Sequence, residues 1–243
     1  MAGASSNGYS TVKDLRLIDC HEAPSGDFFE SLLAQVKALK RFVFVSNDLS
    51  VFEGLEVHVH PSMRGIARGL ILHMASVKEL VLSPSDGTYG TLLLREWFFD
   101  HCFTNLRSVA LPKCLLVQDM TRRSQCLLPS TVEEVQIQFT MSAEHYEESD
   151  QAAIAQQKDT VEVEWLAKAK LVSLPQLKRV IWWYQTCELD GSRMGVGVKG
   201  NPFYDSLDQL RRLREQFSDV EVNFQWVFVP LFNDTPFGRR LDE

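Results

Sequence analysis

The sequence lacks the features that mark a secreted or membrane-spanning protein. Its five cysteines are an odd number, and no two have C-x-x-C spacing, so we expect reduced thiols in a reducing compartment. No stretch approaches the roughly 18 apolar residues of a membrane span. No basic segment followed by an apolar run opens the chain, so we expect no signal peptide. These absences predict a cytoplasmic protein without a membrane partner.

The sequence also lacks an excess of positive charge. Its formal net charge is −7, which argues against a surface-wide basic field for nucleic acid and predicts no DNA partner. Two local basic clusters remain, Lys37 to Arg41 and Arg211 to Arg214. Both are typical of solvated helix faces, although either is able to contact an anion locally.

Motifs that fix a reaction are missing as well. No H-E-x-x-H, Walker A loop or G-x-S-x-G elbow occurs, and we expect no cofactor. His58 and His60 would share one face of a strand, but no third ligand follows in sequence, so no metal site is predicted. Residues 195–200 match G-x-G-x-x-G but lie about ten residues after a strand, too far for the dinucleotide fingerprint.

What the sequence does contain is a recurring strand motif. The pattern apolar-x-x-apolar-x-apolar, rich in β-branched and aromatic residues, predicts six strands. A seventh predicted strand alternates strictly from Val220 to Phe228. The six occurrences are Val12-Leu15-Leu17, Leu39-Phe42-Phe44, Val77-Leu80-Leu82, Leu106-Val109-Leu111, Val132-Val135-Ile137 and Leu177-Val180-Trp182.

Helical patterns separate these strands. The predicted helices cover 28–39, after a cap at 25–27, then 61–75, 92–102, part of 142–174, and 203–217. Within 142–174 the expected apolar stripe is Val161, Trp165, Ala169 and Val172.

Alternating strands and helices predict an α/β fold with a mainly parallel sheet. We expect a flexible tail over 1–10 and a single α/β domain over 11–243. Continuous apolar runs such as Phe42 to Val45 indicate strands buried on both faces, which favours a Rossmann-like three-layer sandwich. The polar positions of 132–138 and of the last strand suit edge or one-sided strands.

The alternative is an irregular horseshoe. The segments LPSTVEEVQIQF (128–139) and LPQLKRVIWW (174–183) resemble the leucine-rich repeats of fungal F-box proteins. Successive occurrences of the motif begin 26 to 45 residues apart, whereas a regular solenoid has a fixed period. This resemblance implies a non-catalytic module that binds a protein partner on its sheet.

Candidate site residues follow the predicted strands, because ligands bind beyond the carboxyl ends of parallel strands. The same residue types also make ordinary turns, so turn chemistry stays open as an alternative. We expect Trp183, on the face opposite Trp182, to line a pocket. The substrate-binding candidates are Asn47, Asp48, Ser83, Ser85, Asp86, Trp183 and Tyr184.

Residues 44–52 suggest a specific reaction. They resemble the nucleophile loop G-V-S-x-x-N-S-x-F of cyclodipeptide synthases, with matches at Ser46, Ser50 and Phe52 and departures at Phe44 and Leu49. VPLFNDTP (229–236) is similar to their segment LPFFLNTP. Their Tyr-x-x-x-Glu pair would fall on phenylalanines 224 and 228, which cannot perform acid–base chemistry.

The resemblance is to the fungal arginine-containing members of this family. It implies an aminoacyl-tRNA-dependent transferase that forms a cyclo-arginyl dipeptide, with charged tRNAs as partners. Ser46 would be the catalytic nucleophile that carries the acyl group. Asp48 or Asp86 would bind the arginyl side chain, and a basic helix at 64–68 or 211–214 would contact the tRNA.

Overall fold

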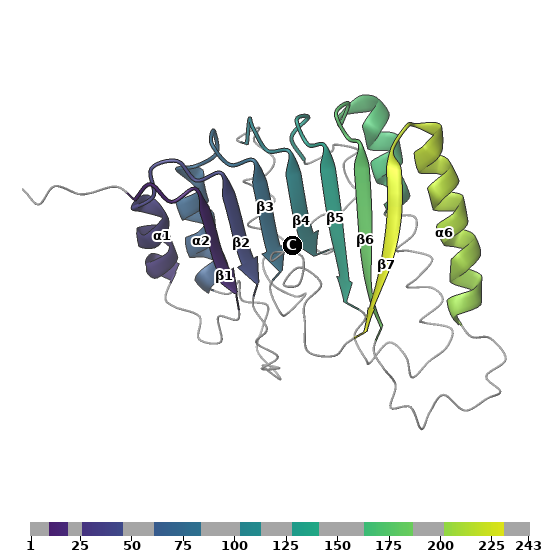
Figure 1. The fold of residues 1–243 in the computed structure, drawn as a ribbon, viewed down its shortest axis with the longest axis horizontal. Coiled ribbons are helices and arrows are strands. Elements are labelled where there is room, and N and C mark those ends of the chain that lie inside the picture. Colours follow the sequence, from purple (N-terminus) through teal and green to yellow (C-terminus); the bar gives the residue numbers. More distant parts are fainter. Residues whose placement is uncertain are drawn as a thin grey trace, which may run out of the picture.

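The computed structural model describes residues 10–18, 26–45, 61–83, 103–112, 128–140, 163–186 and 202–230. Seven parallel strands form one sheet across these ranges (Figure 1). The strands are β1 (Asp14–Ile18), β2 (Arg41–Val45), β3 (Glu79–Ser83), β4 (Ser108–Pro112), β5 (Glu134–Thr140), β6 (Arg179–Thr186) and β7 (Asn223–Pro230).

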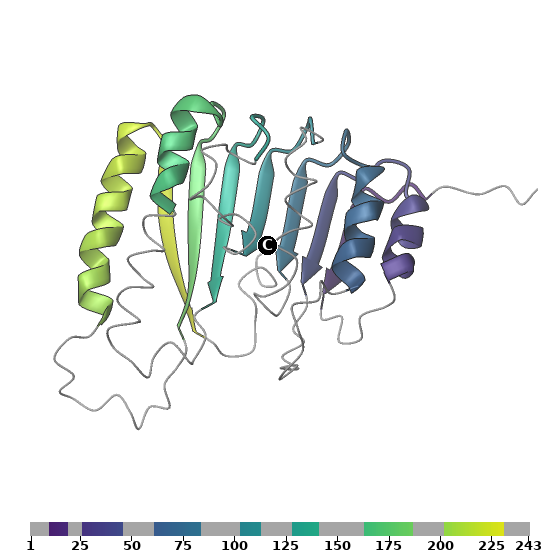
Figure 2. The same cartoon turned by 180° about the vertical axis from the view of Figure 1, so that it is seen from behind.

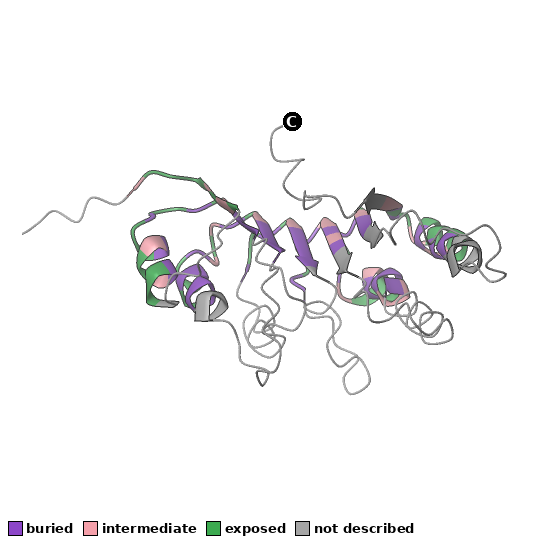
Figure 3. Cartoon of the chain, turned by 90° about the horizontal axis from the view of Figure 1, so that it is seen from below, coloured by how far each residue is buried: buried purple, intermediate pink, exposed green. Residues whose placement is uncertain are grey.

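The described helices form a layer on one face of the sheet. They are α1 (Gly26–Ala34), α2 (Pro61–Ile71), a helix over 163–172, and α6 (Pro202–Asp219). Figure 2 shows the molecule from the side on which these helices lie, and Figure 3 shows the sheet with these helices on one side of it. The predicted α/β fold with a mainly parallel sheet is therefore confirmed. We call the side under the helices the helix face, and the other side the second face.

The strands follow one another across the sheet in the order in which they occur in the chain, from β1 to β7. Crossovers between parallel strands are almost always right-handed, so a chain that keeps adding strands in one direction places its crossovers on one face. The parallel sheet and its helix layer agree with the Rossmann-like prediction. The order has no reversal, however, and such an order is the one expected for the horseshoe alternative.

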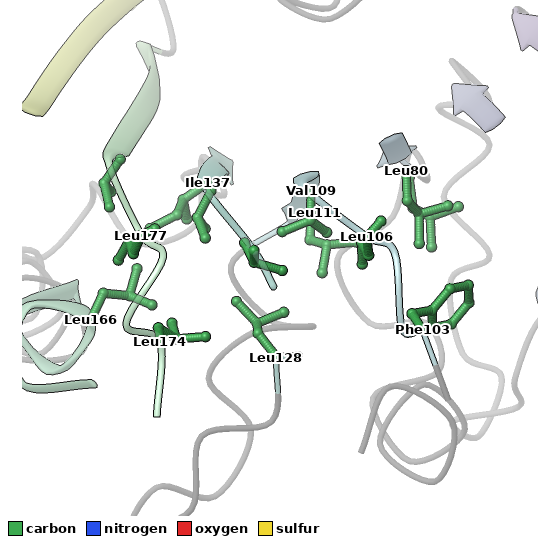
Figure 4. Packing of buried hydrophobic residues seen from close by; sticks show 14 of the residues in the cluster. Leu80, Phe103, Leu106, Val109, Leu111, Leu128, Ile137, Leu166, Leu174 and Leu177 are labelled. Carbon is green, nitrogen blue, oxygen red and sulfur yellow. The ribbon is translucent and has the colours of Figure 1, made fainter. Parts of the chain in front are cut away.

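Burial of the alternating strand positions forms the main core on the helix face. Phe42, Leu80, Val109 and Val180 are fully shielded from solvent there, and side chains from the helices complete the cluster. Figure 4 shows part of this packing, in which Leu106 and Leu177, from the turns that precede β4 and β6, join the strand residues. The motif's first apolar position thus anchors the turns before β2 to β6 to the core, whereas Val12, before β1, is 41% exposed.

The second face of the central strands is also buried. A smaller apolar cluster consists of Val43, Val45, Val81, Ala110, Ile181 and Trp183, and each of these side chains is at most 6% exposed. The continuous apolar runs of β2 and β3 therefore have the two-sided burial that the sequence predicted.

Several element predictions need correction. In the helix over 163–172, Ala169 is buried but Val172 is 86% exposed. The buried positions are Val163, Leu166, Ala167 and Ala169. Val172 is the last residue of the helix and faces solvent, so the predicted stripe is wrong at that end, whereas Trp165 is partly buried against the main core. The predicted helix at 92–102, Val161 and the G-x-G-x-x-G segment lie outside the described residues.

The strands with polar second-face positions occupy different places in the sheet. The sequence predicted edge or one-sided strands here: β7 is at an edge, and β5 is an interior strand between β4 and β6 that buries Val135 and Ile137 on the helix face only. Ser10, the last residue of the predicted tail, bonds through its backbone to Gln35 and Lys37. In the part of the chain that is described, no helix has the length and apolar character needed to cross a bilayer.

Candidate interaction surface

A row of polar residues crosses the second face where the strands begin. The parallel register makes the first residue of each strand a neighbour of the first residue of the next. We call these residues the polar row: Asp14, Arg41, Glu79, Ser108, Glu134, Arg179 and Asn223. Neighbouring strands are about 4.8 Å apart, so these side chains are close enough to pair across the sheet.

Arg41 links the first three strands of the polar row. Its guanidinium lies 2.9 Å from the Glu79 carboxylate and 3.7 Å from that of Asp14. Asp14 also pairs with Arg16 on its own strand at 3.1 Å. Acidic and basic groups thus alternate across β1, β2 and β3, which stabilises neighbouring positions of a sheet.

Arg179 makes the corresponding link at the other end of the sheet. Its Nη1 lies 3.3 Å from Glu134 Oε2, and its Nη2 donates a 2.9 Å hydrogen bond to Gln225 Oε1. These residues come from β6, β5 and β7 in that order. The pairing explains how β5 keeps a charged second-face residue although it is an interior strand: Glu134 is half-buried and has a cationic partner.

Hydrogen bonds extend this network toward the middle of the second face. Trp183 Nε1 donates to Gln136 Oε1 at 3.2 Å, and Gln136 Nε2 donates to Glu134 Oε1 at 2.6 Å. The chain of donors fixes the amide of Gln136 and satisfies the indole N–H of Trp183, which is 6% exposed. Trp183 therefore acts in a structural network on this face.

A second set of charges lies one residue earlier, at the turn before each strand. Glu133 occupies this position before β5 and pairs with Lys178 at 2.6 Å and with Arg107. The hydrogen bond from Lys178, then that from Arg107, lowers the pKa of the Glu133 carboxyl below its usual value. Glu133 is therefore ionised at neutral pH and bridges two cations.

The residues predicted for catalysis are only partly within the described structure. Ser46, Asn47, Asp48, Ser85 and Asp86 lie outside the described residues. Their proposed roles stay predictions.

The remaining candidates are on the sheet. Ser83 ends β3, is 1% exposed and lies beside Val45 of β2. Trp183 and Tyr184 belong to β6, where the Tyr184 backbone is level with Phe139 and Phe228. Three strand spacings, roughly 14 Å, separate β3 from β6, so Ser83 and Trp183 share a face but not a site.

The polar row was not recognised from the sequence, although its signal is present. In most repeats a basic residue follows the motif's first apolar position, and a charged or polar residue follows that, as in Lys40-Arg41, Lys78-Glu79 and Lys178-Arg179. Neither position is apolar, so they do not enter a core prediction. Only the register shows that they align.

Comparison of the chain with protein-family models, with curated proteins and with solved structures gives no match.

Proposed function

We propose that this chain is a leucine-rich-repeat-like protein-interaction module that binds a protein partner at the amino-terminal ends of its strands. The observation that carries the proposal is the strand order. Seven parallel strands in chain order align the same repeat position across the whole sheet, and repeat proteins use such extended aligned surfaces for binding.

The polar row gives this surface its recognition chemistry. Charged and polar groups at the rim of an interface fix orientation and reject unsuitable partners. Arg41 and Arg179 are held by ion pairs within the row, so their positions are set before a partner arrives. A preorganised surface loses less conformational entropy when it binds.

Substitution of Asn223 tests this proposal. Asn223 ends the polar row on the edge strand β7 and is exposed. A natural partner captured on the intact chain is first identified, purified and titrated by calorimetry. Asn223→Trp adds a bulky side chain to the polar row without removing an ion pair. We expect it to weaken partner binding by roughly tenfold or more.

Asp219→Trp is the matched control, because Asp219 is exposed at the end of α6. It adds the same side chain outside the polar row and is expected to change the affinity by less than about twofold. Circular dichroism checks that both variants fold. If Asn223→Trp and the intact chain bind the partner with equal affinity, the partner does not bind at the polar row and the proposal is wrong.

A second candidate function is the seryl transferase. Two-sided burial of β2 and β3 supports it, since a covered sheet leaves the carboxyl ends of the strands for a ligand. If the chain has this activity, mass spectrometry of extracts from cells that express it detects a cyclo-arginyl dipeptide, and Ser46→Ala abolishes that product. An unchanged product level in Ser46→Ala would exclude Ser46 as the nucleophile.

A further inference from the structure

Basic residues form a second aligned row, at the turns that precede the strands. The Lys40 amide donates to the Lys13 carbonyl at 2.8 Å, the Lys78 amide to that of Lys40 at 2.7 Å, and the Arg107 amide to that of Lys78 at 2.8 Å. The same ladder continues through Glu133 to Lys178. We call Lys13, Lys40, Lys78, Arg107 and Lys178 the basic edge.

The charge of the basic edge is only partly neutralised by its own neighbours. Glu133 is the one acidic residue in the aligned positions, and it pairs with Arg107 and Lys178. Lys13, Lys40 and Lys78 are exposed, and their ammonium groups have no partner among the residues that the structure describes. The edge over β1, β2 and β3 therefore presents three adjacent cations to an incoming group.

The spacing of this row matches one face of an α-helix. Adjacent strands are about 4.8 Å apart, so the four cations from Lys13 to Arg107 span roughly 14 Å. Helical residues spaced alternately by three and four positions advance about 5.3 Å per step, so four of them span roughly 16 Å. Flexible lysine side chains absorb the difference. In an extended chain, side chains on one face repeat about every 6.8 Å, which fits less well.

The overall charge favours a protein over a nucleic acid. The chain carries a net charge of −7, so its long-range field repels a dense polyanion while a local basic row still attracts a short acidic segment. We propose that the basic edge binds an acidic α-helix of a protein partner, with carboxylates on one helix face. This inference rests on the proposed function and specifies the chemistry of the partner.

Fluorescence anisotropy with a designed helix tests the proposal. The probe is a labelled alanine-rich peptide with glutamates at alternating spacings of three and four. Its comparator has the same composition with the glutamates distributed around the helix. We expect the one-faced peptide to bind the intact chain roughly tenfold more tightly than the comparator, because it aligns several pairs at once. Equal binding of both peptides would overturn the proposal.

Charge reversal locates the binding site. Lys40→Glu with Lys78→Glu is expected to weaken binding of the one-faced peptide roughly tenfold, because two attractions become repulsions. The control, Lys168→Glu with Arg212→Glu, makes the same charge change at exposed positions of the helix layer. We expect less than about a twofold effect from the control. An equal loss of affinity in both variants would indicate that the overall charge of the protein, and not the basic edge, attracts the peptide, and it would contradict the proposal.

Two further outcomes separate this inference from the proposed function. A single-stranded RNA probe that binds more tightly than the one-faced peptide, and is lost in the Lys40→Glu, Lys78→Glu variant, would overturn the acidic helix in favour of nucleic acid. If the one-faced peptide does not bind while Asn223→Trp still weakens a natural partner, the acidic-helix inference fails and the interaction module stands. If neither effect occurs, both proposals fail.

Discussion

At the scale of single residues, Gly69 shows how closely the first two helices pack. A Cβ at this position would lie 2.5 Å from Leu33 Cδ1 and 2.7 Å from Leu33 Cβ. Leu33 is fully buried in the main core. The buried His73 side chain adds a second contact there, because its Nε2 lies 2.9 Å from the Leu33 carbonyl oxygen. This close approach explains why a glycine interrupts an otherwise amphipathic helix.

The first prediction concerns this contact. Gly69→Ala is expected to destabilise the protein by about 1–3 kcal/mol, because the added methyl group overpacks Leu33. Chemical unfolding measures the change. Leu33→Ala makes room for the added methyl group. The double variant should therefore lose less unfolding free energy than the sum of the two single variants, by at least about 0.5 kcal/mol. A Gly69→Ala variant as stable as the parent would show that α1 and α2 are further apart.

At the scale of elements, the motif predicted strand positions well because it reports burial directly. Each apolar position of the six motifs from 12 to 182 lies in a strand or in the turn before it. Helix ends were less predictable. The helix predicted over 28–39 is α1, Gly26–Ala34, and that predicted over 61–75 is α2, Pro61–Ile71. Residues after each helix, such as Val36, Leu39 and Val77, are still apolar because they anchor the turn. Apolarity alone does not distinguish that anchoring role from one in a helix.

The second prediction tests the corrected face of the helix over 163–172. Leu166→Ala is expected to cost about 2–5 kcal/mol, because Leu166 is 3% exposed within the main core. Val172→Ala is the control and should change stability by less than about 0.5 kcal/mol, since Val172 is 86% exposed. Thermal and urea unfolding give both values. A loss of stability in Val172→Ala as large as that in Leu166→Ala would show that Val172 packs in the core, as the sequence predicted.

At the scale of the whole molecule, the sequence predicted the parallel sheet but not the row of charges at the amino-terminal ends of its strands. Strand type follows from local patterns, whereas the alignment of Lys13, Lys40 and Lys78 depends on strand order and register. Register is fixed by pairing between segments that are far apart in the chain. A short stretch of sequence does not contain both partners, so it cannot predict the register. The sequence predicted a site at the carboxyl ends of the strands because the small polar residues that form turns there are also the residue types of catalytic sites. The amino-terminal ends carry the charges that the register aligns.

Amide hydrogen exchange of the intact chain, alone and with a saturating purified natural partner, most directly tests the claim that function lies at these amino-terminal ends. We predict that binding slows exchange at residues 10–14, 37–41, 75–79 and 104–108, the turns and first strand residues. The carboxyl ends of the strands should exchange at unchanged rates. Protection centred on residues 44–52 and 83–87, with the amino-terminal ends unaffected, would contradict this prediction and favour a ligand site at the carboxyl ends of the strands.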